Sequence, residues 1–111
     1  MNNTILHQKL VNDLLLAFGS MPYVRVWPRV VGVGRAMNNP RQVIRFGLPG
    51  ESDIDGIIMP NGRKLCIEVK TGNAKLSKNQ ETYRNVMVRF GALHIVARDV
   101  LQALEEFEKK R

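Results

Sequence analysis

Four residues near the middle of the chain carry side chains that together can hydrolyse a phosphodiester bond: Asp53, Glu68, Lys70 and Gln80. Asp53 precedes an apolar run, and Glu68 and Lys70 lie in segment 65–70, where apolar and other residues alternate. Because a strand has a side-chain period of two, Glu68 and Lys70 share one face. Carboxylates and a lysine held on neighbouring strands can bind a divalent cation and direct a water toward a phosphate. This spacing predicts a nuclease.

The expected chemistry is metal-assisted. Mg²⁺ usually keeps several waters, so Asp53 and Glu68 suffice as protein ligands, with a backbone carbonyl of Ile67 or Val69 as a further donor. Mn²⁺, which prefers similar ligands, is expected to substitute. Lys70 is expected to orient or deprotonate the attacking water, or to stabilise the charge on the phosphate. The alternative is structural: Asp53 caps a turn, and Glu68 and Lys70 form an exposed pair on a strand.

The chain carries a net charge of +7, and the charge is unevenly distributed. No acidic residue occurs between Leu14 and Gly50, a stretch that contains five arginines: Arg25, Arg29, Arg35, Arg41 and Arg45. Such a positive segment suits a polyanion, and the planar guanidinium group pairs well with phosphate. We therefore expect these arginines, together with Lys75, to contact DNA.

Length and composition are those of one globular domain, which we expect to span residues 1–111. The longest unbroken apolar run, 14–18, is far shorter than the roughly 20 residues that a membrane helix needs. We expect an intracellular, cytoplasmic protein, because the N-terminus does not resemble a signal peptide. The single Cys66 cannot form an internal disulfide, and its place in a predicted strand favours a packed thiol.

Hydrophobic periodicity and turn residues predict the order α, β-β-β, α, β, α. The Pro60-Asn61-Gly62-Arg63 turn predicts an antiparallel hairpin, and Ser77 to Gln80 matches a capping box. A strand that follows a helix favours a parallel crossover, which gives a mixed sheet with helices on both sides. The predicted segments before the second helix are a helix at 4–19, a strand at 23–33 interrupted at Pro28, a mobile loop at 32–42, extended segments 43–48 and 53–59 joined by a bend at residues 48–50, and a strand at 65–70. They are followed by a helix from Ser77 to about Phe90, a strand at 92–97 and a helix from Asp99.

Three segments resemble the VRR-NUC family, a branch of the PD-(D/E)XK nuclease superfamily. These are the segments 45–54 (Arg-Phe-Gly-Leu-Pro-Gly-Glu-Ser-Asp-Ile), 62–72 (Gly-Arg-Lys-Leu-Cys-Ile-Glu-Val-Lys-Thr-Gly) and 76–80 (Leu-Ser-Lys-Asn-Gln). The Gly-Ala-Leu-His-Ile-Val strand that begins at Gly91 extends the resemblance over roughly residues 5–100. The resemblance implies a restriction-endonuclease-like αβββαβ core, an α/β (α+β) fold that agrees with the predicted order of elements.

The resemblance also implies roles for individual residues. Asp53 looks like the metal-binding aspartate of the family, Glu68 like its second metal ligand, and Lys70 like its catalytic lysine. Gln80 looks like the active-site glutamine, although a helix-capping role is open and the two roles are compatible. Many family members carry a glutamate in the first helix, where this chain offers His7, Gln8 and Asp13. His7 is a candidate metal ligand at that place, or a histidine packed in the helix, and Asp55 is a candidate substitute for the missing carboxylate.

Similarity to stand-alone, mostly phage-encoded family members implies a Mg²⁺-dependent, structure-selective endonuclease. Its expected substrate is branched DNA, such as four-way junctions or flaps, in replication, repair or recombination. We expect a twofold homodimer, because symmetric cleavage of a junction needs two active sites, and Trp27, Val30 and Val31 are candidates for its interface. The alternatives are a nuclease for linear duplex DNA or RNA, and a DNA-binding module without catalysis.

Overall fold

The computed structural model describes residues 3–29, 33–36, 39–45 and 47–111, with the side chains of residues 4–29, 41 and 47–111. In this part of the chain the elements follow the order α1 (Asn3–Gly19), β1 (Val24–Pro28), β2 (Val33–Ala36), β3 (Asn39–Arg45), β4 (Ile54–Ile58), β5 (Arg63–Val69), α2 (Lys78–Arg89), β6 (Leu93–Ala97) and α3 (Val100–Lys110).

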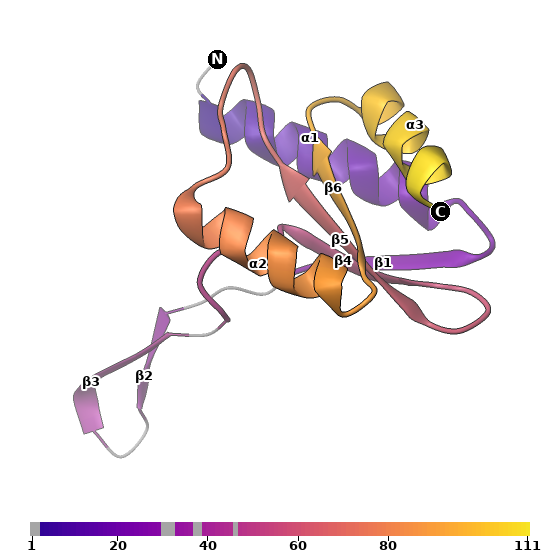
Figure 1. Ribbon diagram of the computed structural model, residues 1–111. Coiled ribbons are helices and arrows are strands. Elements are labelled where there is room, and N and C mark those ends of the chain that lie inside the picture. The colour runs from indigo at the N-terminus through magenta and orange to yellow at the C-terminus, as the bar shows by residue number, and fades with distance from the viewer. Residues whose placement is uncertain (1–2, 30–32, 37–38, 46) are drawn as a thin grey trace.

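The central sheet has the strand order β1-β4-β5-β6. The β1–β4 and β4–β5 pairs are antiparallel, and the chain returns through α2 so that β6 pairs with β5 in parallel. Helices α1 and α3 lie on one side of the sheet and α2 on the other, as Figure 1 shows. The predicted mixed sheet with flanking helices is therefore confirmed, and a β2–β3 hairpin is added between the first two strands of an αβββαβ core.

The hydrophobic core lies between the sheet and the α1–α3 layer. On β5 the alternate residues Leu65, Ile67 and Val69 face this layer and are at most 1% exposed. Phe18 from α1 and Phe107 from α3 are fully buried against them, with ring centroids 5.4 Å apart. The period of two in the strand thus separates an apolar face from a face that is free for polar groups.

The other face of the sheet is polar and is only partly covered. Helix α2 packs mainly against β6 and has no buried residue. On its apolar face, Val86 is 45% exposed and Phe90 84% exposed. Beneath the helix, the face of the sheet contains buried polar residues, among them Asp55, Glu68 and His94. Because the sheet face below α2 is polar, it offers little apolar surface against which the helix could bury its side chains.

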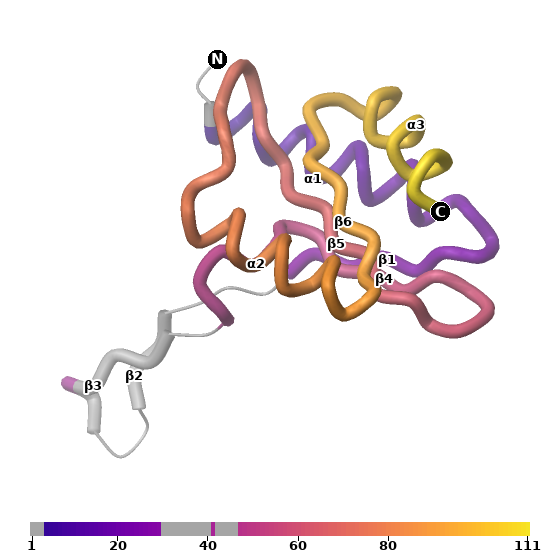
Figure 2. Tube along the Cα trace, in the orientation of Figure 1, coloured from indigo at the N-terminus to yellow at the C-terminus, as the bar shows by residue number. Residues whose placement is uncertain are grey.

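Segment 33–45 differs from the prediction. A mobile loop was expected at 32–42, whereas β2 and β3 form an antiparallel two-stranded sheet with a register shift near Ala36. The prediction was wrong because it gave most weight to the Gly, Asn and Pro residues of this segment, which a hairpin also accommodates at its turn and irregular positions. The hairpin extends away from the body of the protein in Figure 1, and Figure 2 traces the elements of that body in the same orientation.

Two turns position the strands that carry the polar face. The predicted hairpin between β4 and β5 is confirmed, with a cis peptide bond at Met59–Pro60 and a φ of 72° at Gly62. Gly50, with a φ of 77°, lies directly against the backbone of Asn79 at the start of α2. A side chain at position 50 would collide with this backbone, so Gly50 allows the loop before β4 to approach α2 closely.

Candidate active site

The candidate residues come from β5, from α2 and from the loops that precede β4 and follow β5, and they meet at one hollow. Its volume is about 410 Å³, and it is lined by Thr4, His7, Asp53, Glu68, Val69, Lys70, Thr71, Ala74 and Gln80. Asp53 immediately precedes β4, Glu68 lies in β5, and Lys70 follows β5 directly. Because β4 and β5 are antiparallel neighbours, the start of β4 lies beside the end of β5. The predicted set of Asp53, Glu68, Lys70 and Gln80 is brought together at this hollow.

Asp53 is held in place by the neighbouring strand. Its Oδ2 atom accepts a hydrogen bond of 2.8 Å from the backbone N–H of Val69. The Nε2 atom of His7, on α1, lies 3.5 Å from the same oxygen. The backbone carbonyl of Asp53 in turn accepts a hydrogen bond from the N–H of Arg29. These contacts link the loop before β4 to α1, to the end of β1 and to β5, and they fix the carboxylate at the hollow.

Glu68 is the most strongly perturbed acid at the site. It is 3% exposed, its Oε1 accepts a 2.7 Å hydrogen bond from Nε2 of Gln80, and Nζ of Lys70 lies 3.8 Å from Oε1. Its buried Oε2 has no hydrogen-bond partner among the described residues. Burial, and then the neighbouring Asp53 carboxylate, raise the pKa of Glu68 to about 8, although Lys70 and Arg29 oppose the shift. Glu68 is thus an acid whose ionised form is disfavoured by burial and by Asp53 more than it is stabilised by Lys70 and Arg29.

Gln80 combines the two roles that its sequence position suggested. Its Oε1 accepts a hydrogen bond from the backbone N–H of Ser77, and Ser77 Oγ accepts one from the N–H of Gln80, which completes the capping box of α2. The amide Nε2 remains available and donates to Glu68. The side chain of Gln80 therefore caps the N-terminus of α2 and also orients the buried carboxylate of Glu68.

Arg29 occupies a place that its sequence position did not indicate. It was expected to contact DNA as one of a run of arginines, but its side chain is only 20% exposed and its Nη1 lies 3.8 Å from Glu51. It lies close enough to Glu68 to stabilise that carboxylate, and with His7 and Asp53 it lines a smaller hollow of about 220 Å³. Its buried Nε has no hydrogen-bond partner among the described residues. Arg29 is thus a second cation beside the carboxylates.

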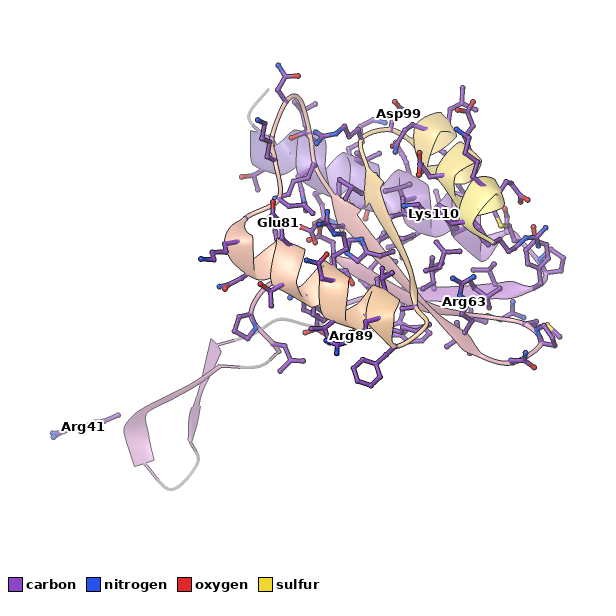
Figure 3. The ribbon with its side chains drawn as sticks, in the orientation of Figure 1. Arg41, Arg63, Glu81, Arg89, Asp99 and Lys110 are labelled. Atoms are coloured by element: carbon purple, nitrogen blue, oxygen red, sulfur yellow. The ribbon has the colours of Figure 1, made fainter. Side chains whose placement is uncertain are left out.

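The other basic residues expected to contact DNA are distributed over the surface. Arg25, Arg41 and Lys75 are exposed. Arg41 lies on β3 and points away from the body of the protein, as Figure 3 shows. The side chains of Arg35 and Arg45 lie outside the described ones, as do the interface candidates Val30 and Val31.

A second polar network, which residue spacing alone barely indicates, lies beside the carboxylates. Ser52 Oγ donates to Asp55, whose Oδ1 is also 2.9 Å from Nζ of Lys64. Cys66 is fully buried next to Ser52 and Tyr83, and burial raises the pKa of its thiol. Asp55 is engaged in this network and does not line the 410 Å³ hollow, so it does not replace the missing first-helix carboxylate there. The period-two spacing of Asp53 and Asp55 was the one signal for this network.

The donor set fits a hard divalent cation with few protein ligands. No group of three or more His, Cys, Asp or Glu side chains within the described residues is arranged to hold a metal ion. The site instead offers two neighbouring carboxylates, those of Asp53 and Glu68. The Oε2 atom of Glu68 is buried, is exposed to the negative charge of Asp53, and has no hydrogen-bond partner among the described residues. Mg²⁺ is commonly bound through one or two carboxylates, with waters and substrate phosphate as its other ligands. A cation here would relieve the carboxylate repulsion that raises the pKa of Glu68.

Comparison with known proteins adds no family assignment. No protein-family model matches the chain, and a search of curated proteins finds no significant relative. Among the described helices, none has both the length and the apolar character required to span a membrane. The function is therefore argued from the site itself.

Proposed function

We propose that this chain is a Mg²⁺-dependent endonuclease that hydrolyses phosphodiester bonds in DNA. The observation that carries the proposal is the proximity of Asp53 to a buried Glu68 whose Oε2 has no hydrogen-bond partner in the described part of the chain, beside the cations of Lys70 and Arg29. Two neighbouring carboxylates that repel each other are stabilised when a divalent cation binds between them. The adjacent cations suit the negative charge of a phosphate.

Each residue has a role that follows from its contacts. Asp53 and Glu68 would hold the ion, which when bound lowers the pKa of a water and withdraws charge from the phosphoryl oxygens. The Val69 N–H and the Gln80 amide keep the two carboxylates in place. Lys70, ion-paired with Glu68, stabilises the charge that develops on phosphorus-bound oxygens as the water attacks. The bond between phosphorus and the leaving oxygen then breaks, and that oxygen takes up a proton.

His7 occupies the position on α1 that faces Asp53, where the resembled family often carries a glutamate. A neutral imidazole at this place can accept a proton from water or contact the ion through Nε2, but it adds no negative charge. We therefore propose a site that binds one ion rather than two. Val69 lines the hollow, and its backbone carbonyl is a candidate further ligand of the ion.

The substrate and assembly extend the same proposal. The resemblance to VRR-NUC proteins favours branched DNA, and the exposed Arg25, Arg41 and Lys75, which are not among the residues that line the hollow, would provide phosphate contacts. Mn²⁺ is expected to replace Mg²⁺, because both prefer oxygen ligands. A twofold homodimer would place two such sites on one junction.

The competing function is a DNA-binding module without catalysis. It is favoured by the absence of a three-ligand metal group among the described residues. Cleavage of matched linear, flap, four-way-junction and RNA substrates, with Mg²⁺, Mn²⁺ or a chelator, separates the two functions. We expect metal-dependent cleavage that is strongest on branched DNA. Absence of cleavage by the wild-type protein with either metal would leave the binding module as the better description.

The substitution Lys70→Ala tests the catalytic assignment. We expect a loss of cleavage of at least about 100-fold with retained DNA binding, since removal of one preorganised charge typically costs 10²–10³ in rate. Lys109→Ala is the matched control, because Lys109 is exposed on α3, the layer on the opposite side of the sheet. Equal cleavage by the two variants would show that Lys70 has no part in the reaction.

A further inference from the structure

The half of the polar sheet face that α2 leaves uncovered carries an aromatic side chain among cations. Trp27 on β1 is 43% exposed, and Ile57 on β4 is 44% exposed. Trp27 pairs with Asp55, and Arg25 pairs with Ile57, so these four side chains share one face of the sheet. Ile57 in turn pairs with Lys64 on β5. The result is an open aromatic and apolar surface with positive groups on both sides.

Lys64 fixes the indole ring at this surface. Its Nζ lies 5.6 Å from the ring centroid of Trp27 and 2.9 Å from Oδ1 of Asp55. The buried Asp55 therefore anchors the lysine, and the lysine holds the ring through a cation–π contact. A tryptophan that is oriented in this way and still 43% exposed loses little freedom when a flat ligand stacks on it.

The surface is continuous with the candidate active site. Arg25 and Trp27 share one face of β1, Arg29 follows the strand directly, and the N–H of Arg29 donates to the carbonyl of Asp53. Two residues of a strand span about 7 Å, so Trp27 lies one such step from the cation beside the carboxylates. A strand whose phosphate contacts Arg29 would bring the neighbouring base to Trp27.

We propose that Trp27 is a stacking site for an unpaired nucleobase next to the bond to be cut. The proposal rests on the proposed nuclease function and deepens it, because it names an unpaired nucleotide as a feature of the substrate. Exposed aromatic rings within a positive groove bind single strands by stacking, since every base has a π face. Arg25, Arg29 and Lys64 supply the positive charge that a nucleic-acid strand requires.

A second copy of this chain fits the same surface less well. Twofold association around Trp27 would place Arg25 and Lys64 near their own copies, and like charges in an interface are unfavourable. The exposed apolar residues at this surface are also few, essentially Trp27 and Ile57. The charge of the surface therefore favours a polyanionic ligand.

Trp27 is the one tryptophan of the chain, so its fluorescence reports on this site alone. The experiment titrates the protein, with chelator present to prevent cleavage, with a thymidine oligonucleotide, the matching uridine oligonucleotide, an abasic strand of equal length and a blunt duplex. We expect saturable quenching by the single strands and much less by the abasic strand or the duplex. Quenching by either single strand supports the proposal, and the stronger of the two identifies the sugar.

Anisotropy of labelled strands provides the second measurement. We expect Trp27→Ala to weaken binding of the thymidine strand about tenfold, with binding of the abasic strand little changed, and Trp27→Phe to retain most of the affinity. Phe90→Ala, which removes a more exposed aromatic residue at the end of α2, is the control. Circular dichroism of each variant confirms folding.

Three results would overturn the stacking site: binding of strands without quenching, equal quenching by the abasic strand, or a concentration-dependent spectral shift without nucleic acid, which would indicate self-association at Trp27. Because the titration is made without metal, the two proposals fail separately. Quenching without any later cleavage would refute the nuclease function alone, and cleavage without quenching would refute the stacking site alone.

Discussion

Replacement of Glu68 by Gln should stabilise the metal-free protein at alkaline pH while it abolishes cleavage. Glu68 is 3% exposed, and its carboxylate faces Asp53. A glutamine has nearly the same shape, its carbonyl can accept the hydrogen bond from Gln80, and its amide can donate to Asp53. The substitution therefore removes the buried negative charge but keeps the contacts of the protonated acid.

The sign and size of the effect follow from the pKa of Glu68. Because the folded-state pKa is about 8 against 4.5 in the unfolded chain, the folded protein keeps a proton that the unfolded chain has released. Stability thus falls as pH rises through this window, by up to about 1.4 kcal/mol per pH unit. From pH 6.5 to roughly pH 9 the wild-type protein should lose about 2 kcal/mol relative to Glu68→Gln.

Urea unfolding at several pH values measures this difference directly. About 2 kcal/mol corresponds to roughly 9 °C in midpoint temperature for a domain of this size, so thermal unfolding is a second readout. Glu105→Gln, an exposed substitution on α3, is the control and should follow the wild-type curve. If the Glu68→Gln curve parallels the wild-type curve, or if the variant is less stable at alkaline pH, the raised pKa of Glu68, attributed to burial and then to the Asp53 carboxylate, is refuted.

A cation should reverse the difference between these two proteins. Mg²⁺ that binds the folded state adds stability according to its concentration, about 2.7 kcal/mol at 100 times its dissociation constant. We expect this gain in the wild-type protein at pH 8 and a much smaller gain in Glu68→Gln. Equal stabilisation of both proteins by Mg²⁺ would place the ion elsewhere.

Two further predictions concern the structure that supports the site. Gly50→Ala should destabilise the protein by roughly 1–3 kcal/mol, because an alanine would need the φ of 77° and would collide with the backbone of Asn79. Urea unfolding measures this loss of stability. An unchanged stability would refute the close approach of the loop to α2. His94 is buried with an unpartnered Nδ1, and burial lowers its pKa from 6.5 to about 4, so its contribution to stability is lost as pH falls through this window. His94→Leu should therefore reduce acid destabilisation by up to about 3 kcal/mol relative to the wild type, as followed by unfolding between roughly pH 6.5 and pH 4.

Local patterns were sufficient for most of the secondary structure. The Pro60 to Arg63 turn, the Ser77 capping box and the helix that follows Asp99 are each specified by residues within a few positions of one another, and all three are confirmed. The hairpin formed by β2 and β3 was missed because glycine, asparagine and proline are compatible with both a loop and an irregular hairpin.

The arrangement of the site could be predicted only in part from such local patterns. Strand alternation predicted that Glu68 and Lys70 share a face, and the hairpin turn predicted that Asp53 lies near them. The position of Arg29 beside Glu68 was not predictable, because it depends on the pairing of β1 with β4, strands separated by a long insertion. The exposure of α2 was likewise hidden, since its apolar spacing resembles that of a buried helix.

The types of groups at the site and their local spacing can be read from the amino-acid order: two acids, a lysine, and a glutamine in a capping box. These features are encoded by backbone periodicity and turn chemistry, which act over a few residues. How much water each group retains, and which charges surround it, depends instead on tertiary contacts. Burial of Glu68 against Asp53, the placement of Arg29 beside both, and the exposure of Trp27 all depend on contacts between elements distant in the chain. Desolvation and charge proximity are properties of those contacts, and they are what turn a common Glu-x-Lys pattern into a candidate metal-dependent site.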